Sequence, residues 1–279
     1  MHSHPSLHQS KRINQAVDAI IRDPAGAVEL QYLADSAYYS RFHFHRLFKN
    51  CTGQTPADFV WQHRLDRAAG IIAYHRDKKL VEVSEACGFS SAANFSRAFR
   101  RQFGMPARAM RGNIDYLNHH YETVKPCADA RTQLGQFFAD AQRQARAHAR
   151  TEDQPLDDNS GLFLRRTDNC EAVYLRNFGQ YLPNTLDAVS NRLHDLVGCS
   201  IDRPRSIGIP RSHPGITARA RRQYDICYEL RIGAEVPADL PVQTLQGGLA
   251  AVFRCEIELP HFYFFCQKIW GWLYNEWLP

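Results

Sequence analysis

The stretch Ser90-Ser-Ala-Ala-Asn-Phe-Ser-Arg-Ala-Phe-Arg-Arg-Gln-Phe-Gly104 decides the fold of the first part of this chain. Serine is a strong helix N-cap and glycine is common just past a helix end, so these bounds predict a helix that runs to Gln102. Phe95 and Phe99 stand about one turn apart and share the inner face of this helix. Polar and basic side chains occupy the other face. The stretch therefore predicts an amphipathic helix with a basic outer surface.

Two shorter features precede this helix, and the same order occurs earlier in the chain. Val81–Cys87 predicts a short helix and Gly88-Phe89 a turn, which together with the longer helix match a helix-turn-helix unit. Upstream, Val28–Asp35 predicts a short helix and Ser36–Tyr39 a turn. A shift of 51 residues pairs Ser40 with Ser91, Phe44 with Phe95, Arg46 with Arg97, Phe48 with Phe99, Lys49 with Arg100 and Gly53 with Gly104. The serine caps, the inward phenylalanines, the basic residues and the terminal glycines all align under this shift. We therefore interpret the region as a duplicated helix-turn-helix unit.

A long helix is predicted between the two units, from Pro56, which suits a first helical turn, to Tyr74. A helix of about 19 residues spans on the order of 28 Å. This length is close to the roughly 34 Å between successive major-groove faces of DNA. Such a rigid spacer would let one chain occupy two adjacent major-groove segments without dimerising. A further helix, from Ser10 to Arg22, is predicted ahead of the first unit.

Charge is divided unevenly along the chain. Residues 1–112 hold 16 lysines and arginines against 9 acidic residues, a net charge of +7. The other 167 residues hold 18 against 20, a net charge of −2. A basic first part with a near-neutral remainder suggests a polyanion-binding domain joined to a second domain. An ordinary solvated surface is the alternative explanation of the positive charge.

The outer faces of the two longer helices carry the candidate binding residues. In a helix-turn-helix unit the second helix enters the major groove. The outward residues are Arg41, His45, Arg46 and Lys49 in the first unit and Asn94, Ser96, Arg97, Arg100 and Arg101 in the second. Arginine suits guanine and asparagine suits adenine. Contacts to phosphates, which position a protein without reading sequence, are predicted for Arg41, Lys49, Arg100 and Arg101. The alternative is that both faces are solvated surfaces of amphipathic helices.

The remainder of the chain changes character. Residues 113–160 are interpreted as a helical connector, with a helix over Ala128–Arg150, followed by a polar linker. From residue 161 onward several apolar runs alternate with period two, which is typical of strands. Strands are predicted at Leu162–Arg166, Ala172–Arg176, Ile207–Pro210, Tyr224–Arg231 and Ala250–Ile257, and helices at Thr185–Val197 and Phe262–Trp277. The sequence thus predicts an all-α domain over residues 8–112 and an α+β domain over residues 161–279.

The first domain resembles the AraC/XylS family of transcriptional regulators. The resemblance covers residues 8–112 and is carried by Ser40-Arg-Phe-His-Phe-His-Arg-Leu-Phe-Lys49 and by Glu85-Ala-Cys-Gly-Phe-Ser-Ser-Ala-Ala-Asn-Phe-Ser-Arg-Ala-Phe-Arg100, closed by Phe103-Gly-Met-Pro106. It implies base contacts by Phe42, His45, Arg46, Ala92, Ala93, Asn94 and Arg97. One departure is Tyr38, where the first turn often has glycine. Because a bulky residue at positive φ is costly, we expect the first turn to be built differently.

The second domain is similar to the gyrase-inhibitor-like effector-binding domain that is fused to some regulators of that family. The matching runs begin at Ala172, Ser206, Arg222, Gly247 and Ile269. They imply two repeats of a strand-helix-hairpin module around a ligand groove lined by Tyr181, Tyr224, Trp270 and Tyr274. For each of these aromatic residues a plain core position is the alternative. Such domains continue past the Trp-Leu-Pro run into a hairpin with an acidic ligand-binding residue, so we expect a C-terminally shortened module ending at Pro279.

These patterns predict a DNA-binding transcriptional regulator tuned by a small organic, cationic effector at the second domain. The alternatives are a second domain that serves protein contacts only, or one of a hydrolase type, although the sequence holds no nucleophile elbow, metal set or acid/base pair. The expected partner is double-stranded promoter DNA, with RNA polymerase as a further candidate, and no cofactor is expected. The eight scattered cysteines, with no signal peptide and no membrane-spanning run, predict a cytoplasmic protein with reduced thiols.

Overall fold

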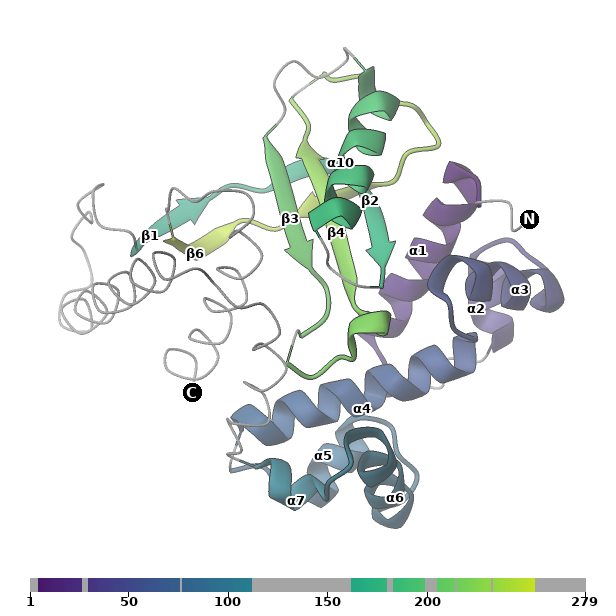
Figure 1. Cartoon of the computed structure of the whole chain (residues 1–279), viewed down its shortest axis with the longest axis vertical. Coiled ribbons are helices and arrows are strands. Elements are labelled where there is room, and N and C mark those ends of the chain that lie inside the picture. The colour runs from purple at the N-terminus through teal and green to yellow at the C-terminus, as the bar shows by residue number, and fades with distance from the viewer. Residues whose placement is uncertain are drawn as a thin grey trace.

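A computed structural model describes residues 5–26, 30–75, 77–111, 162–179, 183–198, 205–213, 215–231 and 233–253 of the chain (Figure 1). The predicted helices Ala128–Arg150 and Phe262–Trp277 lie outside these residues. The described part is helical up to residue 110 and forms antiparallel sheets with a helix from residue 162 onward. This confirms an all-α region followed by an α+β region. Over the same described residues, no helix is long and apolar enough to cross a membrane.

The first helix-turn-helix unit consists of α1 (Leu7–Arg22), α2 (Leu30–Ser36) and α3 (Arg41–Thr52). α1 begins earlier than predicted because Ser6 forms a capping box with Gln9, in which each side chain accepts a hydrogen bond from the other residue's backbone N–H. α3 begins after the predicted cap, Ser40, and ends where Gly53 takes a left-handed φ of 76°.

The second unit repeats this arrangement behind a long helix. α4 (Pro56–Tyr74) has the predicted bounds and is capped by Thr55, whose hydroxyl accepts from the N–H of Asp58. It is followed by α5 (Leu80–Ala86), α6 (Ala92–Phe103) and the short α7 (Ala107–Met110). α6 begins after Ser91 and ends at Gly104, which takes a left-handed φ of 72°. In Figure 1, α4 lies between the sheet region and the group of α5, α6 and α7.

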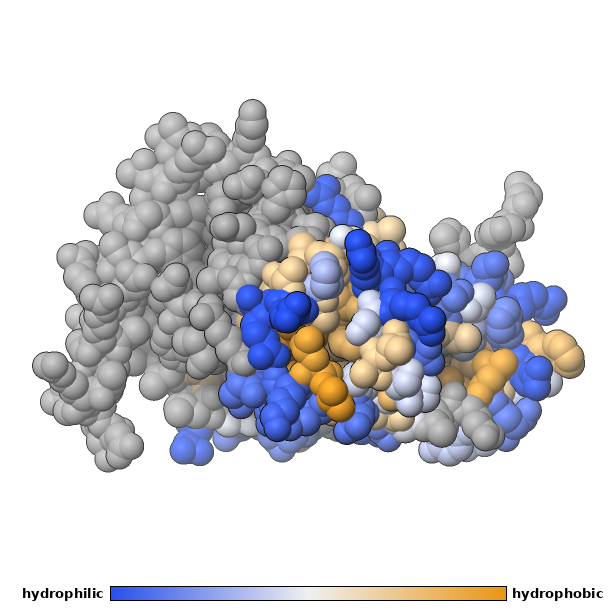
Figure 2. All heavy atoms as spheres, turned by 90° about the horizontal axis from the view of Figure 1, so that it is seen from below, coloured by the Kyte–Doolittle hydropathy of each residue, from blue (hydrophilic) through white to orange (hydrophobic). Residues whose placement is uncertain are grey.

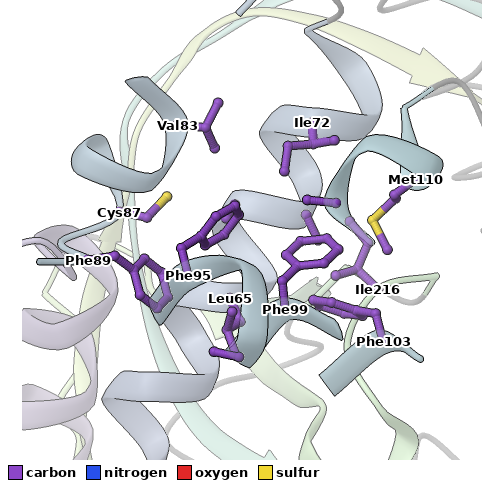
Figure 3. Packing of buried hydrophobic residues seen from close by; sticks show 14 residues of the cluster. Leu65, Ile72, Val83, Cys87, Phe89, Phe95, Phe99, Phe103, Met110 and Ile216 are labelled. Carbon is purple, nitrogen blue, oxygen red and sulfur yellow. The ribbon is translucent and has the colours of Figure 1, made fainter. Parts of the chain in front are cut away.

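Each unit has its own apolar core. Phe44 and Phe48 of α3 are fully buried against α1 and α2. In the second unit Phe95 and Phe99 of α6 are 2% or less exposed and pack against α4 and α5 (Figure 3). The inward position predicted for these four rings is confirmed. Burial of one such side chain contributes about 1.5–3 kcal/mol, so packing rather than helix propensity holds each short unit together.

The two turns use the same backbone geometry with different residues. Gly88 has φ 78°, and a side chain there would place its Cβ 2.8 Å from the Cα of Ala25. Tyr38 has φ 57° in the first turn. The expectation that the first turn would be built differently is therefore wrong. The ring of Tyr38 is exposed and lies 5.2 Å from the guanidinium of Arg12, a cation–π contact that offsets part of the cost of a left-handed tyrosine.

The α+β region contains a four-stranded antiparallel sheet in the order β3-β4-β2-β5. Its elements are β2 (Cys170–Phe178), β3 (Ser206–Pro210), β4 (Gln223–Glu229), β5 (Val242–Leu245) and the helix α10 (Pro183–Val197). Two further strands, β1 (Leu162–Thr167) and β6 (Gly248–Phe253), pair with each other. The five predicted strands are present, and β2, α10, β3 and β4 make one strand-helix-hairpin order.

The two faces of this sheet have different neighbours. Val173 and Ile226 on one face pack against Leu193 of α10 and form the core of the region. Alternate residues point to the other face, because side chains alternate along a strand. These include Arg176 and Asp225, which are opposite each other in the register of β2 and β4. The buried ion pair thus lies on the side of the sheet away from α10, on the same face as a small apolar cluster that contains Tyr174 and Cys227.

Candidate nucleic-acid interface

The two second helices of the units, α3 and α6, have matched starts. The hydroxyl of Ser40 accepts from the N–H of His43, and the hydroxyl of Ser91 accepts from the N–H of Asn94. Both helices have 12 residues and both end at a left-handed glycine. The predicted duplication is therefore present in the backbone as well as in the sequence, and each unit presents one helix of the same length.

The residues predicted to read bases lie on the outer faces of these helices. All seven are exposed, namely Phe42, His45, Arg46, Ala92, Ala93, Asn94 and Arg97. The four predicted phosphate contacts are exposed as well: Arg41, Lys49, Arg100 and Arg101. Phe42 is 85% exposed, which leaves a large apolar ring in water on a basic surface. Such a ring suits contact with a thymine methyl group.

The outer face of α6 is already ordered by one side-chain contact. The guanidinium of Arg97 donates to the side-chain oxygen of Asn94 at 2.6 Å. Figure 2 views the molecule from the side on which α5, α6 and α7 lie in Figure 1. It shows hydrophilic residues spread over the described part of this face, with small apolar patches between them. The surface is polar and basic enough to face a polyanion.

A second contact region, which the sequence did not predict, joins α4 to the α+β region. Ile216 is 5% exposed and packs into the core of the second unit with Phe99, Phe103 and Met110 (Figure 3). The next residue, Thr217, donates its hydroxyl to Asp66 of α4 at 2.9 Å. A lone apolar residue in a loop gives no periodic signal, so sequence reasoning had no means of finding it.

Arg221 lies at the centre of this contact region, which we call the α4 junction and define by Asp66, Ile216, Thr217 and Arg221. Its guanidinium donates to the side chain of Gln62 at 2.8 Å and lies 3.8 Å from Asp66. The amide oxygen of Gln102, near the end of α6, also accepts from this guanidinium, at 3.2 Å from Nη1. The junction therefore connects the α+β region to the spacer helix and to the second candidate recognition helix.

The first unit is attached to the sheet separately. Arg176 pairs with Asp225 through two hydrogen bonds of 2.7 and 2.9 Å and reaches Asp18 of α1 at 2.8 Å. Arg211 also donates to Asp225, at 2.8 Å. Lys11 of α1 donates to the carbonyl of Ala238 at 2.9 Å. Since the α+β region contacts α1 through its sheet and α4 through the segment between β3 and β4, it braces the two units against one another.

Three ionisable groups in or near the α4 junction have shifted pKa values. Burial raises the pKa of Asp66 to about 6, against the opposing effect of Arg221. Burial lowers the pKa of His63 to about 4, and nearby Arg67 lowers it further. Burial also lowers the pKa of His213 to about 4, with a contribution from Arg222. Both histidines are consequently neutral at pH 7, and this part of the molecule responds to acid.

The described part of the predicted ligand groove is small. Tyr224 lies half-buried on β4, against the core beside α10. A side chain at Gly208 of β3 would collide with the hydroxyl of this tyrosine, so the ring covers that glycine. Tyr181, Trp270 and Tyr274 lie outside the described residues, as does the expected shortened end. Tyr224 occupies a packing position here, and its part in a groove stays a prediction.

The chemistry of the sheet region favours a structural role for its buried groups. Asp225 is fully buried and accepts hydrogen bonds from two arginines, Arg176 and Arg211, an arrangement that suits a structural ion pair. Burial raises the pKa of the Cys227 thiol to about 12 and, in α3 of the first unit, that of the Cys51 thiol to about 11, which disfavours reactive thiolates. Within the residues that the structure describes, no group of His, Cys, Asp and Glu is arranged to hold a metal.

Comparison with known proteins identifies the first region. A family model described as "Helix-turn-helix domain" matches residues 33–113. The "Probable transcriptional regulator LumQ" of Photobacterium leiognathi is 42% identical over 78 residues, which are 28% of this chain and 31% of that protein. The "HTH-type transcriptional activator RhaS" of Yersinia pestis is 31% identical over 106 residues, 38% of each chain. The chain thus matches well under half the length of these relatives.

Two solved structures align with the same region. The DNA-binding domain of AdpA, in complex with a target DNA, is 29% identical and covers 37% of this chain and 91% of its own, with a TM-score of 0.35. A transcriptional regulator from Chromobacterium violaceum is 29% identical and covers 36% of this chain and 88% of its own, with a TM-score of 0.34. The family model begins within α2 and extends past α7, so residues 33–113, which include both α3 and α6, match a helix-turn-helix domain.

Proposed function

We propose that this protein is a sequence-specific transcriptional regulator that reads two successive major-groove segments with α3 and α6 of a single chain. The observation that carries the proposal is the pairing of two equal helices with matched caps, buried inner rings and exposed basic outer faces. α4 separates them by 19 helical residues, a length of about 28 Å. That separation suits two major-groove faces on one side of a duplex.

Within this proposal the exposed residues divide into two roles. Arg46 of α3 and Arg97 of α6 occupy equivalent positions and read guanine edges, while Asn94 reads adenine. The methyl groups of Ala92 and Ala93 make apolar contacts, as does Phe42. The phosphate contacts come from Arg41, Lys49, Arg100 and Arg101, which fix the register on the duplex.

The α+β region tunes this DNA reading, because it contacts both α1 and α4. Each contact fixes one unit relative to the sheet, through Asp18 for the first unit and through the α4 junction for the second. A ligand or partner that changes these contacts changes the free energy of placing both helices in the groove at once. A second domain used for protein contacts alone has no requirement for this bracing.

Electrophoretic mobility shifts at several salt concentrations test the proposal. We expect the logarithm of the binding constant to fall linearly with the logarithm of salt concentration, with a slope of about −0.9 for each phosphate contacted. The duplexes come from selection out of a random pool, so that the preferred site is found rather than assumed. Salt-insensitive binding, or equal binding to every sequence in the pool, would reject the proposed function.

A further inference from the structure

A cavity of about 320 Å³ lies beside the α4 junction, between α4 and the segment of residues 211–223. Phe59, His63 and Gly70 line it from α4, and Ser212 and Ile216 line it from the other side. Small-molecule sites in proteins typically have volumes of about 300–1,000 Å³. Tyr224, the one described residue of the groove expected in the second domain, is not among the residues that line the cavity.

The charges that line the cavity do not balance. Three guanidinium groups face it, those of Arg67, Arg211 and Arg221, against the single carboxylate of Asp66. The guanidinium of Arg221 lies 3.8 Å from Asp66, and that of Arg211 pairs with Asp225 outside the lining. Among the described residues no carboxylate lies within ion-pair distance of Arg67, which is exposed and so stands at the mouth of the cavity. An excess of one sign of charge around a cleft attracts a ligand of the opposite sign.

The pKa values of the two histidines in the cavity wall are lowered in part by the same excess of positive charge. The pKa values of His63 and His213 are lowered first by burial and second by Arg67 and Arg222, respectively. The Nδ1 of His213 accepts from the N–H of Gly215 at 3.0 Å, so its proton is on Nε2, 2.8 Å from the hydroxyl of Tyr74. The wall therefore contains neutral imidazoles beside cationic guanidiniums, a combination that disfavours a cationic ligand.

We infer that this cavity binds a small organic monoanion, an aromatic carboxylate that pairs with Arg67 and lies against the apolar surfaces of Phe59 and Ile216. One unmatched guanidinium suits a single negative charge, whereas a phosphate dianion would bring more charge than the wall neutralises. The apolar residues of the wall suit a flat hydrocarbon body rather than a bare ion. The ligand inferred for this cavity is thus an anion, whereas the effector expected for the groove of the second domain is a cation.

Binding of a ligand in the cavity would affect the arrangement of α3 and α6. This consequence rests on the proposed function. The two walls belong to the two regions that the α4 junction holds together. A ligand that touches both walls stabilises the docked arrangement over any arrangement in which the walls separate. The orientation of α4, and with it the spacing of α3 and α6, is then coupled to the ligand.

The site is tested by calorimetric titration of the full chain with benzoate, benzyl alcohol and benzamidine, which share a ring and differ in charge. We expect benzoate to bind with one site per chain and at least about tenfold more tightly than the other two, a difference of about 1.4 kcal/mol. No binding of benzoate at millimolar concentration, or equal binding of all three probes, would overturn the assignment.

Two pairs of variants locate the binding. Gly70→Leu fills the cavity and should abolish benzoate binding, whereas Gly70→Ala should retain it, because the added Cβ would lie 3.8 Å from Ile216, an ordinary contact. Arg67→Gln should weaken binding at least about tenfold. Its matched control is Arg108→Gln on α7, an exposed arginine outside the cavity lining. Unchanged binding in both Gly70→Leu and Arg67→Gln would place the anion elsewhere and reject this cavity.

The regulatory consequence is measured separately by mobility shift. Benzoate should change the DNA affinity of the wild-type chain and of Gly70→Ala and leave that of Gly70→Leu unchanged. Binding of benzoate without any change in DNA affinity would reject the coupling alone. Loss of DNA binding in every sample, with benzoate binding intact, would reject the proposed function while leaving the site in place.

Discussion

The guanidinium of Arg97 and the side-chain oxygen of Asn94 are joined by a hydrogen bond of 2.6 Å on the exposed face of α6. The bond restrains two side chains that are expected to read neighbouring bases, so less side-chain entropy is lost when they meet DNA. It also occupies the asparagine oxygen that an adenine contact would use. We therefore expect the two residues to contribute to DNA recognition together rather than as independent contacts.

The first prediction concerns this pair. Arg97→Ala should cost about 1–3 kcal/mol on the selected DNA site and relax specificity at one base pair. Asn94→Ala and the double variant should complete a double-mutant cycle with an interaction energy of about 0.5–3 kcal/mol. The measurement is a mobility shift on the selected duplex and on single-base substitutions of it. Arg101→Ala is the control and should weaken binding to all sequences alike. Strictly additive effects would mean that the bond plays no part in recognition.

The second prediction concerns Ile216. Ile216→Ala removes a buried side chain from the core of the second unit and should cost about 2–5 kcal/mol of local stability. Amide hydrogen exchange should accelerate in α5 and α6, while α2 and α3 keep their protection. Ile216→Val, which keeps most of the volume, should cost only about 0.5–1.5 kcal/mol. Equal acceleration in both units would indicate global destabilisation instead of a specific contact with the second core.

A third prediction follows from the left-handed tyrosine in the first turn. Tyr38→Gly and Tyr38→Ala both remove the contact of the ring with Arg12, but only glycine takes positive φ without strain. The glycine variant should therefore be more stable than the alanine variant by about 1 kcal/mol. Urea unfolding of the two variants measures this difference. An alanine variant as stable as the glycine variant would show that the turn carries no strain.

The fourth prediction is a pH dependence of stability set by Asp66 of the α4 junction and by His63 and His213, which line the cavity. The folded-state pKa values of His63 and His213 are about 4, below the unfolded value of 6.5, so the unfolded chain binds more protons between pH 6.5 and 4. Folding stability should fall through this window as the pH is lowered. The pKa of Asp66 is raised to about 6, so its protonation favours the folded state as the pH falls from 6 toward 4. Two histidines outweigh one aspartate, and the net effect is loss of stability.

Variants separate these opposing contributions. Asp66→Asn removes the group that gains a proton on folding, so the loss of stability between pH 6.5 and 4 should become steeper. His213→Phe removes one group that loses a proton, so the loss should become shallower. Chemical unfolding at several pH values measures both slopes. A shallower slope in Asp66→Asn would contradict the assigned direction.

Much of the helical region is predictable because its signals are local. The caps Ser40, Ser91 and Gly104 lie within one turn of the helix ends they define, and the shift of 51 residues aligns both units residue by residue. The strand pattern predicts five of the six described strands. The pattern does not predict β5, because this strand has only four residues and half of them are exposed. Its alternation therefore gives a weak apolar signal.

The α4 junction was beyond prediction because its residues are remote in sequence. Asp66 and Thr217 are separated by 151 positions and by a change of structural class. Neither Ile216 nor Arg221 belongs to a motif, and an apolar residue beside polar neighbours in a loop predicts nothing by itself. The contact exists because the sheet region places this loop against α4, which depends on the tertiary fold of both regions.

Because α4 is one continuous helix of 19 residues, the number of its residues sets the separation of α3 and α6. Each residue added within it would turn the second unit by about 100° and move it by about 1.5 Å, so no single insertion preserves the phase. It would also carry Asp66 away from Thr217 and Arg221. Under the proposed function, base preference would change through substitutions on α3 or α6 one position at a time, whereas the distance between the two DNA segments would change only in whole-residue steps that the rest of the protein resists.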